Sequence, residues 1–136
     1  KAYTYLRMDQ AKLNSIGNAF MNHYYGTFDN AQARANLAGL YQDASVMSYE
    51  GKTFQGRNPI MAHLTQGVQF TTVQHIVKSF DVQHTGNGLL VCVTGDLKVD
   101  GGENPIKFSQ TFHLLPTDAS ATNFWVRNDV FRLNYG

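Results

Sequence analysis

The sequence has few of the features by which catalytic and metal-binding proteins are recognised. Its single cysteine, Cys92, excludes an internal disulfide, and the apolar run around it favours a small buried side chain over a reactive thiol. The five histidines are scattered, without a short ligand pair or an HExxH spacing, and no serine stands in a GxSxG motif. No glycine-rich run has the pattern of a phosphate-binding loop. These absences favour a protein that binds, without a metal or cofactor, over an enzyme.

Charge is also scarce. Only 15% of the 136 residues are charged, the net charge is +1, and the eleven cations are dispersed, so we expect no binding to nucleic acid or to acidic membranes. No apolar run approaches the roughly 20 residues of a membrane span, and the N-terminus lacks a signal pattern. With 43% hydrophobic residues, the chain is expected to form one soluble, intracellular domain over residues 1–136.

The first half of the chain has helical patterns. Apolar residues at three- and four-residue steps predict a helix from about residue 8 to about residue 28, with Leu13, Ile16, Phe20 and Tyr24 on its buried side. Asp29 or Asn30 is suited to cap a second helix, which would bury Leu37, Leu40 and Tyr41. Asn58 and Pro59 predict a short third helix that ends near Gly67.

From Phe70 onward the apolar residues alternate. Between residues 89 and 99 the odd positions are apolar and the even ones mixed, as in a half-buried antiparallel strand. Similar segments at 108–115 and 124–133 predict two more strands, and His75 lies within another as an expected core histidine with a partner. A short strand is expected to end near Glu50, before a KTFQ turn. Helices followed by hairpin-linked strands imply an α+β fold, with one mixed or antiparallel sheet wrapped over the helices.

Acidic and aromatic residues form the remaining candidate site. Glu50 is one of only two glutamates and follows Tyr49, while Asp100 and Glu103 stand around a GGEN turn. Each of these carboxylates is also consistent with an ordinary solvated turn residue. The binding interpretation requires them to surround an apolar depression at the open end of the sheet.

Seven ordered segments resemble the nuclear transport factor 2 family. They are FMNHYYGTFDN (20–30), LAGLYQDASVMSYEG (37–51), FQG (54–56), FTTVQHIV (70–77), GDLKVD (95–100), FSQTFHL (108–114) and NDVFRLNYG (128–136). The resemblance covers nearly the whole chain. It implies a cystatin-like cone, in which helices pack on a strongly bent, mainly antiparallel sheet around a hydrophobic cavity, and a homodimer formed through the sheet face.

Members of this family carry the GDP form of the GTPase Ran through nuclear pores. The resemblance implies that an aromatic side chain of Ran enters the cavity, while cations of Ran meet rim acids that correspond to Glu50, Asp100 and, across a one-residue insertion, Glu103. Tyr49 would stand at the cavity edge, where family members often have tryptophan. The implied wall consists of Val68, Phe70, Val73, Leu97, Val99, Val130 and Phe131. For each of these residues, ordinary core or dimer packing is the alternative.

A second implied activity is weak binding to the phenylalanine-glycine repeats of nucleoporins. Leu13 occupies the helix position where family members often expose an aromatic residue, and a helix-packing leucine is the alternative. The resemblance also implies a location in cytoplasm and nucleus, concentrated at the nuclear pore.

Two other classes of function stay open. An isomerase or dehydratase could use the same cavity, with a proton-transfer pair drawn from Asp129, His75, Tyr24 and Tyr41. The chain could also be a peptide-binding adaptor domain.

Overall fold

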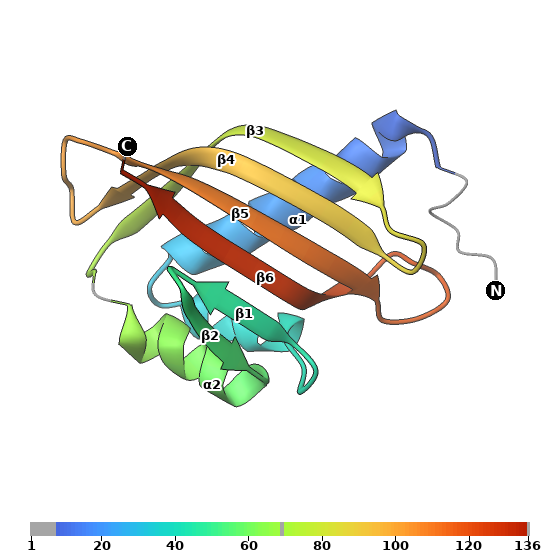
Figure 1. The fold of residues 1–136 in the computed structure, drawn as a ribbon, viewed down its shortest axis with the longest axis horizontal. Helices are drawn as coiled ribbons and strands as arrows, with labels where there is room; N and C mark the ends of the chain where they lie inside the picture. The colour runs from blue at the N-terminus through green and yellow to red at the C-terminus, as the bar shows by residue number, and fades with distance from the viewer. Residues whose placement is uncertain (1–7, 69, 136) are drawn as a thin grey trace.

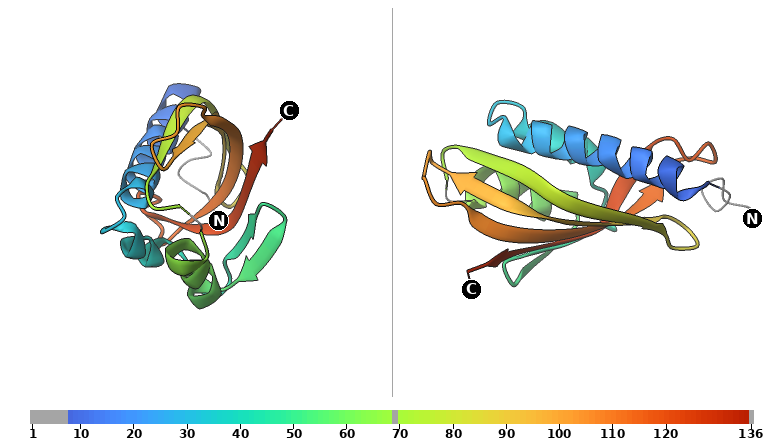
Figure 2. Two further views of the ribbon diagram at one scale, coloured as in Figure 1. Left: turned by 90° about the vertical axis from the view of Figure 1, so that its left-hand side faces the viewer. Right: turned by 90° about the horizontal axis from the view of Figure 1, so that it is seen from above.

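The computed structural model describes residues 8–68 and 70–135. One six-stranded sheet curves around a long helix, α1 (Figures 1 and 2). The strand order is β2-β1-β6-β5-β4-β3. The strands are β1 (Val46–Tyr49), β2 (Lys52–Gln55), β3 (Val73–His84), β4 (Leu89–Val99), β5 (Ile106–Pro116) and β6 (Phe124–Asn134). The pair β1–β6 is parallel and the other neighbours are antiparallel, so the predicted α+β fold with a mainly antiparallel sheet is confirmed.

Helix α1 (Gln10–Asp29) begins and ends within two residues of the sequence prediction. Its N-cap is Asp9, whose side chain accepts a 2.9 Å hydrogen bond from the backbone N–H of Lys12. One face of the helix is apolar and packs against the concave side of the sheet (Figure 2). The buried residues of this face are Leu13, Gly17, Phe20, Met21, Tyr24, Tyr25 and Phe28.

The other helices differ from their predictions in how they begin. The second is a 3-10 helix, η2 (Arg34–Leu40), and neither Asp29 nor Asn30 caps it. The Asp29 carboxylate instead accepts hydrogen bonds from His75, and Asn30 accepts one from the backbone N–H of Gln32. The third helix starts after Gly56 rather than at Asn58. It runs through α2 (Arg57–Ala62) into one π-helical turn, η3 (His63–Gly67), and so ends at the predicted glycine.

The strands with clear alternation were predicted well. The bounds of β4 coincide with the predicted segment, and β5 and β6 each extend no more than two residues beyond theirs. The prediction of a turn at KTFQ is wrong, because these four residues form β2 and pair with β1. No described helix is long and apolar enough to span a membrane.

Two irregularities accompany the curvature of the sheet. The register shifts between Val77 and Ser79 in β3 and between His113 and Leu114 in β5, and such bulges increase the local bend and twist of a strand. Gly95 lies opposite Val77, where a Cβ atom would stand 2.1 Å from the carbonyl oxygen of Ile76. Only glycine therefore permits this close approach of β3 and β4.

Candidate functional site

The register of the strands brings the predicted rim and wall residues to one end of the sheet. Tyr49 pairs with Phe131 across β1 and β6, and Val73 pairs with Val99 across β3 and β4. The β4–β5 turn, which contains Asp100 and Glu103, lies at this same end, and so does the last turn of α1 (Figure 1). Segments that are far apart in the sequence are thus collected at the open end of the curved sheet.

Glu50 is held in place by the neighbouring strand β6. Its carboxylate oxygen Oε2 accepts a 2.6 Å hydrogen bond from the backbone N–H of Leu133, and its own N–H donates to the carbonyl of Phe131 at 3.0 Å. The backbone of Glu50 is left-handed, with φ of 51°. Oε1 has no hydrogen-bond partner among residues 8–68 and 70–135. One of the two carboxylate oxygens is therefore fixed by β6.

Asp100, which follows β4, is held by backbone N–H groups in a similar way. Its Oδ1 accepts hydrogen bonds from the backbone N–H groups of Thr71 at 2.6 Å and Thr72 at 2.9 Å. The backbone φ is 52°, again left-handed. Glu103 is exposed, and its side chain makes no hydrogen bond or ion pair within the described part of the chain, so it lies in the same turn without being fixed.

Aromatic rings predicted to form the cavity wall lie at the same end of the sheet as these acids. The rings of Tyr49 and Phe131 stack at 4.5 Å between centroids, with 16° between their planes, and Phe70 lies 6.3 Å from Phe28. Val73, Leu97 and Phe131 are buried, whereas Val68, Phe70 and Val99 are half-buried at the edge. Burial of Tyr49, followed by the negative charges of Asp129 and Glu50, raises the pKa of its phenol. This tyrosine therefore stays neutral and can act as a polar-tipped packing residue.

Two predicted site residues lie elsewhere than expected. Val130 cannot belong to the inner wall, because its neighbours Asp129 and Phe131 both point inward and alternation places it on the outer face, 45% exposed. Leu13 is only 3% exposed and packs in the core, so the helix-packing alternative describes its position. Cys92 was expected to be buried, but it lies on the outer face of β4 and is half-buried.

A polar network lies deeper between α1 and the sheet. The carboxylate of Asp129 is fully buried and accepts hydrogen bonds from Tyr41 at 2.8 Å, from Gln110 at 2.8 Å and from Tyr24 at 3.3 Å. The two phenol oxygens are 2.6 Å apart. Tyr25 extends the network by donating to Gln110 at 2.8 Å. Burial raises the pKa of Asp129 to about 6, although the three hydrogen bonds partly oppose this shift.

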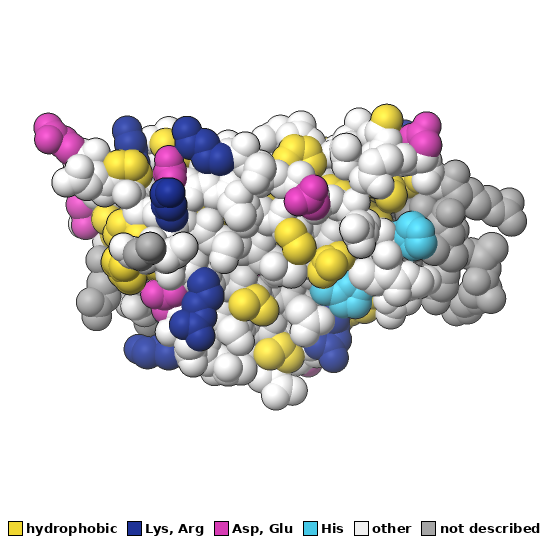
Figure 3. All heavy atoms as spheres, turned by 45° about the horizontal axis from the view of Figure 1, so that its top comes forward, with side chains coloured by type: hydrophobic (Ala, Val, Ile, Leu, Met, Phe, Trp, Pro, Cys, Tyr) yellow, Lys and Arg dark blue, Asp and Glu magenta, His cyan; other side chains and the backbone are white. Residues whose placement is uncertain are grey.

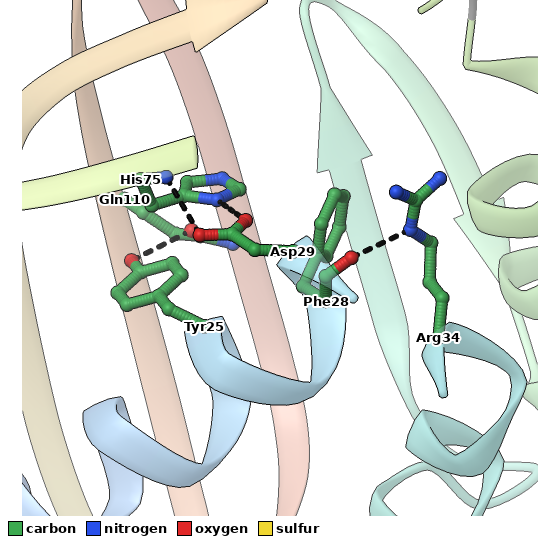
Figure 4. A network of polar contacts seen from close by, with 6 residues as sticks. All are labelled: Tyr25, Phe28, Asp29, Arg34, His75 and Gln110. Carbon is green, nitrogen blue, oxygen red and sulfur yellow. Dashed lines mark hydrogen bonds and ion pairs between the residues drawn. The ribbon is translucent and has the colours of Figure 1, made fainter. Parts of the chain in front are cut away.

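A half-buried pair joins α1 to β3. Asp29 accepts a 2.6 Å hydrogen bond from Nδ1 of His75 and a 2.8 Å bond from the His75 backbone N–H (Figure 4). The imidazole also stacks on Tyr25, with 4.6 Å between ring centroids. The predicted core histidine with a partner is thus confirmed. The polar residues named for proton transfer are real interior groups, but both oxygens of Asp129 are occupied by protein donors, which suits a structural network.

Two further polar residues near these aromatic rings were not predicted from the sequence. Arg34 is buried between the rings of Phe28 and Phe70, and His63 packs between Tyr49 and Phe54. Burial, followed by the charge of Lys52, lowers the pKa of His63. In retrospect, an arginine with no acidic residue within four positions on either side was the available hint of a cation committed to tertiary contacts.

The bent sheet wrapped over one long helix, with aromatic rings and fixed carboxylates at its open end, defines a cone-shaped α+β protein. Residues 16–133 match the family model described as Nuclear transport factor 2 (NTF2) domain. The chain belongs to the nuclear transport factor 2 family.

Similar proteins span almost the whole chain. It is 45% identical over 130 residues to nuclear transport factor 2B of Arabidopsis thaliana, covering 94% of this chain and 99% of that protein. Its identity to nuclear transport factor 2 of Saccharomyces cerevisiae is 39%, covering 90% and 94%. The solved structure of nuclear transport factor 2 from Cryptosporidium parvum superposes with a TM-score of 0.82 at 39% identity, covering 90% and 95%. A hexachlorocyclohexane dehydrochlorinase from Novosphingobium barchaimii shares the fold alone, with a TM-score of 0.70, 15% identity and coverage of 92% and 88%.

Proposed function

We propose that this chain is a nuclear transport carrier that binds the GDP form of Ran, and that it is not an enzyme. The observation that carries the proposal is the carboxylate of Glu50, fixed by Leu133 beside the stacked rings of Tyr49 and Phe131. Relatives named as transport factors, at about 40% identity over nearly their full length, support the same assignment. The fold-sharing dehydrochlorinase is too distant in sequence to support an enzymatic role.

The binding mechanism needs no chemistry. An aromatic side chain of Ran would pack against Tyr49, Phe70 and Phe131 and supply most of the affinity, because a desolvated aromatic anchor is the usual hot spot of an interface. The fixed carboxylates of Glu50 and Asp100 would meet cations of Ran and orient its approach, while the exposed Glu103 would add a weaker contact. Nucleotide selectivity would be indirect, since a switch loop changes shape with the γ-phosphate.

The outer face of the sheet is the proposed dimer interface. This face carries hydrophobic side chains scattered among polar ones (Figure 3), and Val130 is 45% exposed on it. In a two-fold interface the same face of each chain meets its copy, so one exposed hydrophobic residue contributes twice. A homodimer would present two Ran sites.

Nucleoporin binding is the second part of the proposed carrier role. Because Leu13 is buried, we assign the contact with phenylalanine-glycine repeats to neighbouring residues of α1. A groove of about 380 Å³ on that helix is lined in part by Ile16, Phe20, Leu40 and Phe124. A carrier of this kind would move between cytoplasm and nucleus and concentrate at the nuclear pore.

The direct test is a calorimetric titration of the chain with Ran loaded with GDP and, separately, with a GTP analogue. The proposal expects saturable binding of the GDP form and binding at least tenfold weaker for the analogue. No binding of either form, or equal binding of both, would contradict it.

A further inference from the structure

Arg34 is the most deeply buried cation of the described chain. Its residue is 6% exposed, and its Nε donates a 2.7 Å hydrogen bond to the carbonyl of Phe28 (Figure 4). The guanidinium carbon lies 5.0 Å from the ring centroid of Phe28 and 5.3 Å from that of Phe70. These contacts hold the guanidinium rigidly between two aromatic rings.

The charge of Arg34 is not neutralised by its surroundings. Its Nη2 is buried and has no hydrogen-bond partner among residues 8–68 and 70–135, and neither ion pair of that part of the chain includes it. Burying a guanidinium without an anion is costly, and an unmade hydrogen bond adds to that cost. An unsatisfied buried donor of this kind is normally paired with water, an ion or a ligand, none of which the described chain supplies.

A second unsatisfied atom lies in the same region. Nε2 of His63 is buried without a partner in the described structure, and its ring lies 4.7 Å from that of Tyr49. The helices that begin with these residues, η2 and η3, contact each other. We call Phe28, Arg34, Tyr49, His63 and Phe70 the aromatic corner. It is apolar apart from a few polar atoms, as ligand sites usually are.

We propose that the aromatic corner binds a small aromatic carboxylate. The ligand ring packs against Tyr49 and Phe70, and a carboxylate oxygen accepts a hydrogen bond from Nη2 of Arg34. Nε2 of His63 offers the second polar contact. This site shares Tyr49 and Phe70 with the proposed Ran cavity, and it goes beyond the carrier function because its ligand is a small molecule.

The charges around Tyr49 determine the orientation of such a ligand. Asp129 and Glu50 act on the Tyr49 phenol as negative charges, and Arg34 acts on it as the opposing positive charge. A carboxylate placed here is repelled by the first two and attracted by the third. The anionic end must therefore face Arg34, which favours a planar ring with its carboxylate at one end.

Phenylacetate is a suitable probe, and its amide, phenylacetamide, is a neutral match of the same shape. The chain, labelled with ¹⁵N, is titrated with each and followed by NMR of the backbone and of the Arg34 Nε–H group. The site predicts phenylacetate binding with a Kd on the order of 1 mM, as befits so small a ligand, and at least tenfold weaker binding of the amide. Shifts should concentrate at Arg34, Tyr49 and Phe70.

Two arginine variants separate the role of the charge from general damage. Arg34→Met should weaken phenylacetate binding at least tenfold. Arg57→Met is the matched control, because Arg57 also donates Nε to a backbone carbonyl, that of Tyr41 at 2.7 Å, from an exposed position outside the aromatic corner. Arg57→Met should bind phenylacetate like the unaltered chain.

Three results would overturn the proposal. The first is the absence of NMR shifts at phenylacetate concentrations up to about twenty times the expected Kd. The second is equal affinity for the acid and the amide. The third is equal affinity of the two arginine variants for phenylacetate. Each result would show that Arg34 does not pair with an aromatic carboxylate. If Arg34→Met does not fold, the acid–amide comparison on the unaltered chain decides alone. None of these experiments contains Ran, so their failure leaves the carrier proposal standing.

Discussion

Glu50 and Leu133, 83 residues apart in the sequence, are joined by a 2.6 Å hydrogen bond from a backbone N–H group to a carboxylate oxygen. The bond crosses the parallel pair of β1 and β6, so the position of the acid is set by the sheet rather than by its own loop. A carboxylate fixed in this way loses little side-chain entropy when it meets a cation of a partner. The same logic applies to Asp100, which Thr71 and Thr72 hold.

Substitution of Asp100 should separate its structural role from its charge. Asp100→Asn keeps an acceptor oxygen and tolerates the left-handed backbone, so the free energy of unfolding should change by less than about 0.5 kcal/mol. Asp100→Ala removes the acceptor and strains the backbone, and should cost about 1–2 kcal/mol. Asp100→Gly should fall between them, because it relieves only the strain. Urea denaturation measures all three, and equal stability of the Asn and Ala variants would contradict the assignment.

Asp129 should make stability depend on pH. Its pKa is about 6 in the folded chain against an ordinary 3.8, so the folded state favours the protonated acid. The resulting stabilisation is fully present below about pH 4 and is lost as the pH rises through about 6. The shift corresponds to about 3 kcal/mol. Relative to Asp129→Asn, the unaltered chain should therefore lose about that much free energy of unfolding between pH 4 and pH 8.

The free energy of unfolding is measured for the unaltered chain and for Asp129→Asn at several pH values, and the two are subtracted. Altered hydrogen bonds in the Asn variant change this difference by the same amount at every pH, so only its variation with pH reports on Asp129. Asp81→Asn, an exposed change on β3, serves as the control and should not alter the pH dependence. A difference between unaltered chain and Asp129→Asn that stays constant from pH 4 to pH 8 would show that Asp129 has an ordinary pKa.

Two glycines on α1 should respond oppositely to alanine. At Gly17 a Cβ atom would stand 2.3 Å from Cγ2 of Val82, so Gly17→Ala should destabilise the chain by about 1–3 kcal/mol. At Gly26 nothing lies within 4 Å, and Gly26→Ala should stabilise by about 0.5–1 kcal/mol through helix propensity alone. Thermal unfolding of the pair tests the packing of α1 on β3; the account fails if both changes stabilise.

Val130→Glu should convert the proposed dimer into a monomer. The substitution places two like charges in the two-fold interface, where they are brought together and desolvated. Light scattering after size exclusion should give twice the chain mass for the unaltered protein and one chain mass for the variant. Val130→Thr, which keeps the branched shape, should remain dimeric. A monomeric unaltered chain would contradict the proposed interface.

The parts of the fold that the sequence predicted are those governed by local periodicity. Strand β4 alternates clearly from Leu89 to Val99, and α1 carries an unbroken apolar stripe. Strand β2 was missed because its four residues are largely exposed and show no alternation; it is a strand only because β1 pairs with it. Asp29 was misread as a helix cap because its true partner, His75, is 46 residues away.

In the candidate site, too, the features that depend on contacts between distant residues could not be predicted from the sequence. Glu50 and Asp100 were predicted as site residues from their places beside an aromatic residue and a turn, and then from the family resemblance. The hydrogen bonds that hold them depend on strand pairing that no local pattern reveals. Val130 was assigned to the wrong face although its alternation with Phe131 was visible in the sequence. Arg34 was missed because its neighbours, Phe28 and Phe70, meet only in the folded chain.

The central claim is that the fixed carboxylate of Glu50 binds Ran in its GDP form. Glu50→Gln can still accept the hydrogen bond from Leu133 and loses only the charge, whereas Asp81→Asn loses the same charge at an exposed site on β3. Calorimetric titration of Ran-GDP into both variants and the unaltered chain is the most direct measurement. The account predicts that Glu50→Gln weakens binding at least about tenfold and that Asp81→Asn leaves it unchanged. Equal affinity of Glu50→Gln and the unaltered chain would contradict it.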